Sequence, residues 1–167
     1  MLIDYLYDYY NSIPPPRARF LASNNLALPA VLFRAIKGFD TKFPFAAGED
    51  REFCDRWRHH GYGMIYAPEV EVRHSHLLKF QTFCKQHFNY GRAALYFHKV
   101  RAERGKKRIK VEPLRFYLDL LSYPFMHLQA GRSKVLAMLL LISQAVNTAG
   151  FCWDALSRPA KRLMPVA

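Results

Sequence analysis

The chain has 167 residues, which is long enough for one domain with a real hydrophobic core. A hydrophobic fraction of 51% and an aromatic fraction of 15% argue against intrinsic disorder. The formal net charge of +12 favours an anionic partner, namely a membrane surface, a nucleic acid or a phosphorylated substrate, and charge alone does not choose among them.

Cysteine usage and the first residues bear on the cell compartment. Cys54, Cys84 and Cys152 are odd in number, far apart and form no CxxC pair, which argues against a disulfide framework or a cysteine zinc site. Reduced cytoplasmic thiols are the simplest interpretation. Residues 1–10 have no basic start and no long apolar run, so they do not resemble a signal peptide. Either the chain is cytoplasmic, or it is a fragment whose start lies upstream.

The first third of the chain mixes short elements and turns. Residues 2–11 predict a short helix that the following prolines end. Residues 20–28 mix apolar and small polar side chains, as a strand that enters an active-site loop does. Pro29 is typical of a helix start and favours a helical segment at 30–36, after which residues 38–40 predict a turn.

The middle of the chain predicts one helix and two short strands. Residues 49–60 place Phe53, Trp57 and His60 on one helical face, and Gly61 is a typical helix stop. Residues 63–67 and 69–73 then read as extended pieces separated by a proline. In the second piece apolar and charged residues alternate, which is the period of a half-buried strand.

The last part of the chain returns to helical periodicity from residue 77 onward. A basic run occupies residues 99–110, and apolar segments follow at 113–129 and 133–153. The change in composition near residue 99 predicts two parts. These are residues 1–98, and a basic linker with a helical tail at 99–167.

An acidic pair and a histidine are the candidate chemical groups. Glu49 and Asp50 follow Gly48 at a predicted helix start, where amides and the helix dipole favour charged carboxylates. A carboxylate at such a junction is well placed as a general base, and ordinary capping of the helix is the alternative interpretation. His74 ends the second predicted strand, and a neutral imidazole is a frequent metal ligand.

Several segments of the chain match, in the same order, the motifs of one enzyme family. Residues 22–28 (ASNNLAL) are similar to the family's N-x-A-x-R strand, and residues 38–40 (GFD) to its GGFDE turn. Residues 45–50 (FAAGED) resemble its GGED motif, and residues 51–61 (REFCDRWRHHG) resemble xDLxxRLxxxG. Residues 66–74 (YAPEVEVRH) are similar to Y-x-P-x-A-x-V-x-H. The FNYGR segment at 88–92 resembles the yGR sequence that often follows in this family. In this order, the segments resemble the acceptor-side half of a GT-A-type family 2 glycosyltransferase.

The resemblance implies an α/β fold, an incomplete GT-A half-domain, followed by apolar helices that associate with a membrane. It implies that Asp50 deprotonates the acceptor hydroxyl and that Glu49 binds or orients the acceptor. Asn25, Gly48 and Arg51 are then expected to contribute to substrate binding. His74 would match a histidine that ligates a divalent metal, Mg²⁺ or Mn²⁺. This metal would stabilise the negative charge of the departing diphosphate in an inverting transfer.

The sequence departs from the family pattern in three respects. Lys37 replaces the glycine expected before Gly38, and the arginine expected after Ala27 is absent, which leaves the acceptor's identity open. The sequence also contains no Asp-x-Asp motif. We therefore expect the donor-binding half to be missing and the chain to be inactive alone, unless another chain supplies that half.

The basic run and the tail predict a membrane surface as a partner. Seven Lys or Arg against one acid at residues 99–110 form a positive patch beside apolar helices. Each basic residue near an anionic surface contributes about 1 kcal/mol to membrane binding. Residues 135–153 approach the roughly 20 residues of a bilayer span, but their polar residues favour an interfacial or re-entrant helix. Simple packing of these helices on each other is the alternative.

The sequence therefore predicts part of a glycosyltransferase at the cytoplasmic face of the cell membrane. Its substrates would be a nucleotide-sugar donor and a hydroxyl acceptor on a lipid-linked or cell-envelope glycan. Arg158, Lys161 and Arg162 fit a cytoplasmic flank. The alternative is a non-enzymatic, membrane-binding remnant of such an enzyme. Nucleic acid is not an expected partner, because no recognition motif accompanies the basic run.

Overall fold

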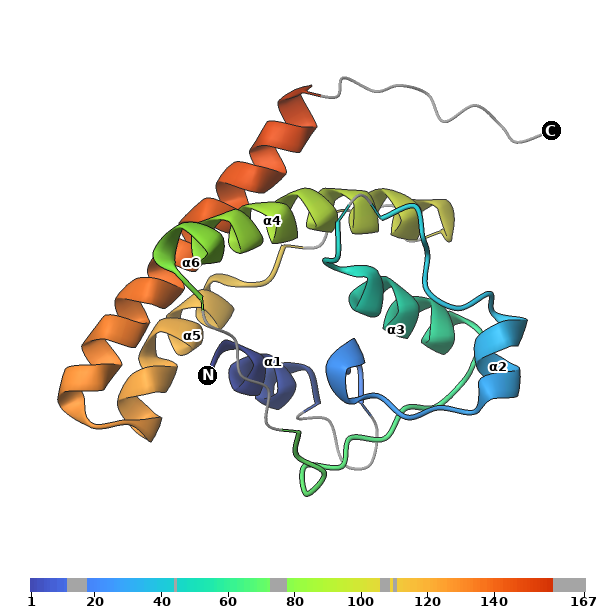
Figure 1. Cartoon of the computed structure of the whole chain (residues 1–167), viewed down its shortest axis with the longest axis horizontal. Helices are drawn as coiled ribbons and strands as arrows, with labels where there is room; N and C mark the ends of the chain where they lie inside the picture. The colour runs from blue at the N-terminus through green and yellow to red at the C-terminus, as the bar shows by residue number, and fades with distance from the viewer. Residues whose placement is uncertain (12–17, 44, 73–77, 106–108, 110, 158–167) are drawn as a thin grey trace.

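The computed structural model describes residues 1–11, 18–43, 45–72, 78–105, 109 and 111–157. The chain is a set of helices joined by irregular segments (Figure 1). In chain order they are α1 (Leu2–Asn11), the short 3₁₀ helix η1 (Ser23–Asn25), α2 (Ala30–Ala35), α3 (Glu49–His59), α4 (Phe80–Glu103), α5 (Leu114–His127) and α6 (Ala130–Ser157).

The predicted α/β fold is wrong: the residues that the structure describes form no β-strand. Residues 20–28 are irregular around η1, and residues 63–67 form only an isolated bridge at Ile65. Val70 and Val72, expected to face a core in alternation, are 58% and 53% exposed. Extended segments need a paired neighbour to satisfy their backbone groups, and the described residues offer no sheet for them to join.

The helical predictions agree with the structure over most of the chain. The helix at 2–11 is α1, the segment after Pro29 is α2, and α3 ends next to Gly61, whose φ of 82° is left-handed. Phe53 and Trp57 are buried as expected, but His60 caps α3 and is exposed. The predicted boundary between residues 98 and 99 falls inside α4, which continues unbroken to Glu103.

The turn before α3 keeps a backbone conformation that suits glycine. Gly38 has a φ of 61°, and Lys37, which stands where the resembled family has glycine, has a φ of 66°. A non-glycine residue there carries some strain. The backbone is therefore left-handed at both Lys37 and Gly38.

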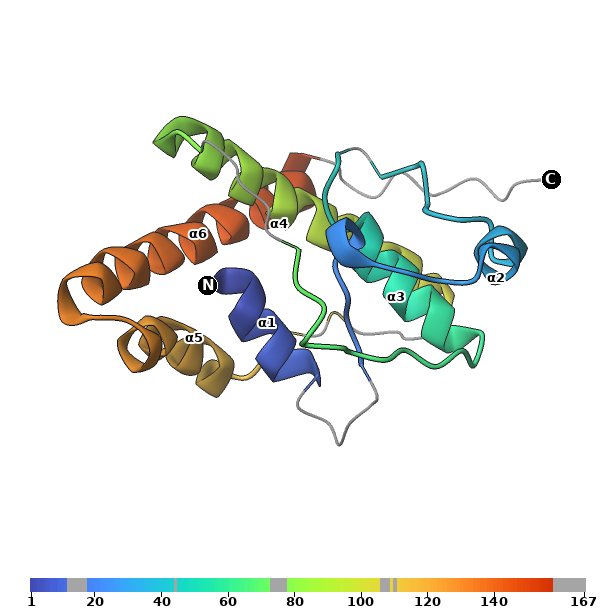
Figure 2. The same ribbon diagram turned by 60° about the horizontal axis from the view of Figure 1, so that its bottom comes forward.

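Three small apolar clusters hold the helices together. One joins α1, α5 and α6 through Tyr5, Phe116, Leu120 and Leu140; α1 lies beside α5 in Figure 2. A second packs Phe43 and Ala47 of the loop before α3 against Ala93 and Phe97 of α4. The third packs α2 against α3 around Ile36, Phe53 and Trp57. The second cluster positions the loop that leads into the acidic pair.

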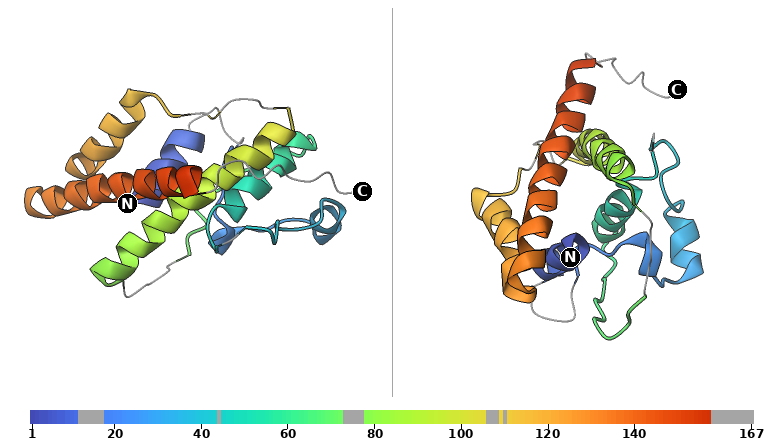
Figure 3. Two further views of the ribbon diagram at one scale, coloured as in Figure 1. Left: turned by 90° about the horizontal axis from the view of Figure 1, so that it is seen from above. Right: turned by 60° about the vertical axis from the view of Figure 1, so that its left-hand side comes forward.

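The longest helices of the described structure, α4 and α6, cross each other (Figure 3). Two glycines, Gly91 and Gly150, lie where their backbones meet. A Cβ atom on Gly91 would lie 1.8 Å from the Asn147 carbonyl oxygen, and one on Gly150 would lie 2.0 Å from the Phe88 carbonyl oxygen. Such separations are far below van der Waals contact, so the two backbones touch where only glycine fits.

Candidate functional site

The acidic pair lies where the sequence predicts it, at the first turn of α3. Gly48 is the residue before the helix, and its φ of 80° turns the chain into α3. A Cβ on Gly48 would lie 3.4 Å from the Ala93 side chain and from the Phe43 ring. The left-handed backbone and the close neighbours both favour glycine at this position.

Asp50 has a partly buried side chain whose carboxylate oxygen Oδ1 accepts a hydrogen bond from the Arg51 backbone N–H at 2.7 Å. Burial raises the pKa of Asp50 above its ordinary value, although the backbone amides of Arg51 and Ser23 act in the opposite direction. Asp50 forms no ion pair with a residue that the structure describes. The raised pKa makes Asp50 a stronger base, and no salt bridge with a described residue holds its carboxylate.

Glu49 contributes a second carboxylate in an unusual state. Its Oε2 atom is buried and makes no hydrogen bond within the described part of the chain. Burial raises the pKa of Glu49, and the neighbouring charge of Asp50 acts in the same direction. A buried, unpartnered carboxylate oxygen destabilises the fold, and such groups are found where function requires them.

Tyr90 on α4 lines a surface pocket whose lining residues do not include Glu49 or Asp50. Its hydroxyl oxygen accepts a hydrogen bond from Gln86 Nε2 at 2.6 Å. Burial raises the pKa of Tyr90, and the charges of Asp50 and Glu49 raise it further, which places the three groups within electrostatic reach. The pocket, of about 320 Å³, is lined by Phe45, Ala46, Ala47, Thr82, Lys85, Gln86, Asn89 and Tyr90.

The other predicted binding residues have structural contacts. The Arg51 guanidinium lies over the rings of Tyr10 and Phe20, 5.1 and 5.5 Å from their centroids, and so connects α3 to the α1 side of the molecule. Asn25 is exposed, and its Nδ2 donates to the Val70 carbonyl oxygen at 2.7 Å. A role of either residue in substrate binding stays a prediction. His74 lies outside the described residues.

Arg92 is the residue that sequence reasoning missed. Its guanidinium lies 4.3 Å from the centroid of the Phe45 ring, which lines the pocket, and its Nε lies 2.7 Å from Asp154 Oδ1 on α6. One side chain thus joins the pocket loop to α6. The FNYGR segment contained both Tyr90 and Arg92, so the resemblance pointed to the region without giving either residue a role.

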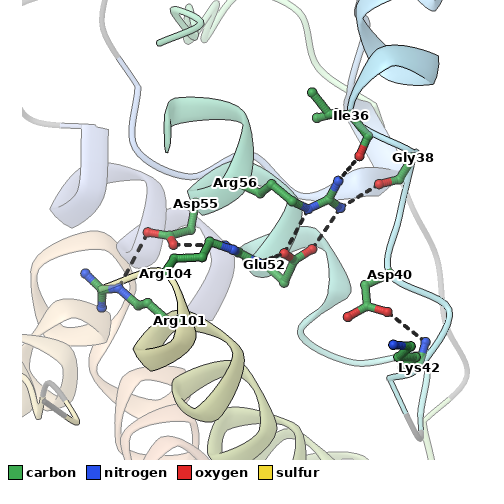
Figure 4. Close-up of polar contacts among 9 residues, drawn as sticks. All are labelled: Ile36, Gly38, Asp40, Lys42, Glu52, Asp55, Arg56, Arg101 and Arg104. Carbon is green, nitrogen blue, oxygen red and sulfur yellow. Dashed lines mark hydrogen bonds and ion pairs between the residues drawn. The ribbon is translucent and has the colours of Figure 1, made fainter. Parts of the chain in front are cut away.

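An ion-pair cluster behind the site fixes α3 to the end of α4 (Figure 4). Glu52, which is 1% exposed, pairs with Arg56 and Arg104, and Asp55 pairs with Arg101 and Arg104. Arg56 also donates to the carbonyl oxygens of Ile36 and Gly38, holding the turn before α3. Arg101 and Arg104 of the predicted basic run therefore form ion pairs within the fold.

The described residues leave the divalent-metal site a prediction. No group of three or more His, Cys, Asp or Glu side chains that could hold a metal ion occurs among them. Glu49 and Asp50 supply two carboxylates, which do not by themselves form a complete ligand set for Mg²⁺ or Mn²⁺. A metal site would need His74 or groups from a substrate or another chain.

α6 is the one helix of the described structure that is long and apolar enough to cross a membrane, judged by length and composition alone. The core helix of a soluble protein can pass the same test, but only 17% of the apolar window of α6 is buried. Most of the apolar surface of α6 is therefore exposed in this structure.

In comparisons with known proteins, no protein-family model, no curated protein and no solved structure matches the chain.

Proposed function

We propose that this chain is the acceptor-side part of an inverting glycosyltransferase that works at the cytoplasmic face of a membrane. The proposal rests on the site and on the order of the family 2 motifs, and it does not include a sheet. The observation that carries it is Asp50, a partly buried carboxylate without an ion-pair partner among the described residues at the start of α3. Next to it in the chain is Glu49, whose Oε2 has no hydrogen-bond partner in the described residues, and both charges act on Tyr90 of the pocket.

Asp50 acts as the general base in this proposal. A base is most effective when its pKa lies close to the working pH, and burial moves the pKa of Asp50 in that direction. The ionised carboxylate takes the proton of an acceptor hydroxyl. The oxygen then forms a bond to the anomeric carbon as the bond to the nucleoside diphosphate breaks, so the anomeric configuration inverts.

The pocket beside Tyr90 is the proposed acceptor site. Its wall combines Phe45 and Tyr90 rings, which suit the apolar face of a sugar, with hydrogen-bonding groups on Thr82, Gln86 and Asn89. Glu49 lies within electrostatic reach of Tyr90 and would accept a hydrogen bond from an acceptor hydroxyl. The acceptor is a glycan or lipid-linked hydroxyl compound.

The donor is a nucleotide-sugar, and its binding half would be supplied by further sequence or by another chain. A divalent cation, Mg²⁺ or Mn²⁺, would neutralise the diphosphate when bound, with His74 as a ligand from this chain. The chain's own part in the reaction is to bind and orient the acceptor and to remove its proton.

A membrane-binding remnant without catalysis is the second candidate. The specific observation in its favour is the exposed apolar side of α6, where Trp153 and Leu156 are 59% and 81% exposed. This candidate explains the tail and the net charge. It does not explain why Glu49 and Asp50 retain raised pKa values in a partly buried position.

The test of the enzyme is sugar transfer by the protein in membranes of the cells that produce it. Radiolabelled nucleotide-sugars are supplied in turn, and label is counted in lipid and glycan fractions. We expect Asp50→Asn to lower transfer about 10²-fold or more, since a general base contributes 10²–10⁴-fold, while donor binding stays unchanged. Asp119→Asn, an exposed position on α5, is the matched control and keeps full transfer.

Two results would count against this assignment. Full transfer by the Asp50→Asn protein would show that Asp50 is not the base. Absence of transfer from every donor by the wild-type protein, with membrane binding intact, would favour the non-enzymatic remnant.

A further inference from the structure

α6 buries mainly small and polar residues and exposes large apolar ones, which is the reverse of a helix on the surface of a water-soluble protein. Four of its five buried residues are small or polar: Ser133, Ser143, Gly150 and Asp154. The side turned away from the protein carries large apolar residues that are 54–81% exposed, and we call it the outer face of α6: Val135, Met138, Leu141, Trp153 and Leu156. A helix of a water-soluble domain buries its apolar side and exposes its polar side.

This reversed pattern fits a lipid environment. Helices in membranes place small and polar residues against their neighbours and apolar residues toward lipid. Asp154 is the only charged residue between Lys134 and Ser157, and it is turned inward to Arg92. The exposed cations Arg132 and Lys134 begin the helix, and the chain carries a net charge of +12, which complements anionic headgroups.

The packing of α4 decides how α6 can lie in the bilayer. α4 crosses the inner side of α6 in direct backbone contact at Gly91 and Gly150. Charged residues occur along α4, among them Lys85, Arg92 and Lys99, and charged side chains at the centre of a bilayer are costly. A spanning α6 would draw α4 and these charges into the hydrocarbon.

We propose that α6 lies in the plane of an anionic membrane surface, with its outer face embedded and its inner face holding α4 on the aqueous side. The outer face extends over 21 residue steps, or about 32 Å at 1.5 Å per residue, and would enter the bilayer by about 5–10 Å. This inference rests on the membrane partner of the proposed function and not on sugar transfer.

The two tryptophans of the chain permit a direct test. Trp57 is 6% exposed and serves as a protected reference, whereas Trp153 is on the outer face. The protein is bound to vesicles of phosphatidylcholine and phosphatidylglycerol that carry lipids brominated either near the headgroup or near the chain end. Quenching is measured for wild type, and for Val135→Trp and Ala145→Trp in a Trp153→Phe background.

We expect the tryptophans at 135, 145 and 153 to report the same shallow depth, because an in-plane helix keeps its outer face level. Deep quenching confined to position 145 would show a helix that crosses the bilayer and would overturn the proposal. Lack of quenching at all three positions, with the helical circular dichroism unchanged, would overturn it as well and would point to another partner, such as a second copy.

A substitution on the outer face adds an affinity test. Leu141→Glu should weaken vesicle binding about 10-fold or more, because it replaces an embedded apolar side chain by a charge. Val31→Glu changes an aliphatic residue of α2 that is 70% exposed, compared with 56% for Leu141, and should leave binding unchanged. Equal effects of the two variants would contradict the assigned face. Shallow, level quenching together with no sugar transfer would keep this inference and reject the enzyme.

Discussion

Glu49 and Asp50 occupy the first two positions of α3, where backbone amides and the helix dipole favour negative charge. The pKa of both residues is nevertheless raised, because burial removes water from the carboxylates. Desolvation therefore outweighs the helix end.

Glu49→Gln tests this balance through stability. A pKa that is raised on folding means that the carboxyl's stabilising contribution is present below its unfolded pKa and lost as pH rises through the folded value. We therefore expect the glutamine protein to be more stable at neutral pH by about 1 kcal/mol, and equally stable in acid where Glu49 is protonated. Denaturant unfolding at several pH values measures the difference.

The control is Glu103→Gln, which neutralises an exposed glutamate in the last turn of α4 and should change stability little at any pH. The buried Oε2 would not be a source of instability if Glu49→Gln did not increase the free energy of unfolding at neutral pH, or increased it equally in acid.

Among the elements, α3, α4 and α6 form a chain of connections that ends at the pocket. Glu52 and Asp55 fix α3 to α4 through Arg101 and Arg104, and the paired glycines fix α4 to α6. Arg92 then connects α6 back to the pocket loop. The placement of α6 and the shape of the candidate site are thereby linked through packed side chains.

Gly91→Ala tests the crossing of α4 and α6. Its Cβ would lie 1.8 Å from the backbone oxygen of Asn147, so one helix must move. We expect a loss of about 3 kcal/mol or more, above the usual range for overpacking, because the obstacle is backbone and not a flexible side chain. Thermal unfolding by circular dichroism measures it.

Gly131→Ala is the matched control in the same pair of helices. A Cβ there meets nothing within 4 Å, and alanine is the better helix former by about 1 kcal/mol, so stability should rise slightly. Equal responses at the two glycines would mean that α4 and α6 do not approach as closely as described.

For the whole molecule, the distribution of charge matters more than its sum. Arg101 and Arg104 belong to the basic run but are held in ion pairs at 23% and 15% side-chain exposure, so they are not free to meet a membrane. Arg132 and Lys134, at the start of α6, are exposed. Arg132 and Lys134 should therefore contribute more to membrane attraction than Arg101 and Arg104, whereas Lys106, Lys107, Arg108 and Lys110 of the basic run lie outside the described residues.

The double variant Arg132→Gln/Lys134→Gln tests this distribution. Two lost charges at about 1 kcal/mol each should weaken binding to anionic vesicles about 30-fold at low salt, and the difference should shrink as salt rises. Sedimentation of vesicles with bound protein measures the partition. Arg34→Gln/Lys42→Gln removes the same charge from exposed positions near α2 and should have a much smaller effect. Equal losses would show that net charge alone governs binding.

Local sequence patterns were sufficient to predict most of the helices and the position of the acidic pair. The apolar spacing around Phe53 and Trp57, the glycine stop at Gly61 and the helix start after Pro29 are local signals, and local hydrogen bonds complete a helix. Gly48 was located by the same means, because its position before the acids marks a helix start. Membrane association of the tail stays a prediction, and the exposed outer face of α6 now indicates which side would contact lipid.

Contacts between distant segments determine the fold class, the pKa of the carboxylates and the side of α6 that faces outward. Strands depend on partners distant in sequence, so the alternation around Val70 predicted a sheet that the described residues do not form. The pKa of Asp50 depends on burial by neighbouring segments, and the role of Arg92 depends on Phe45 and Asp154, which are 47 and 62 residues away. Hydrophobic periodicity shows that a helix has two sides, but packing determines which side is covered.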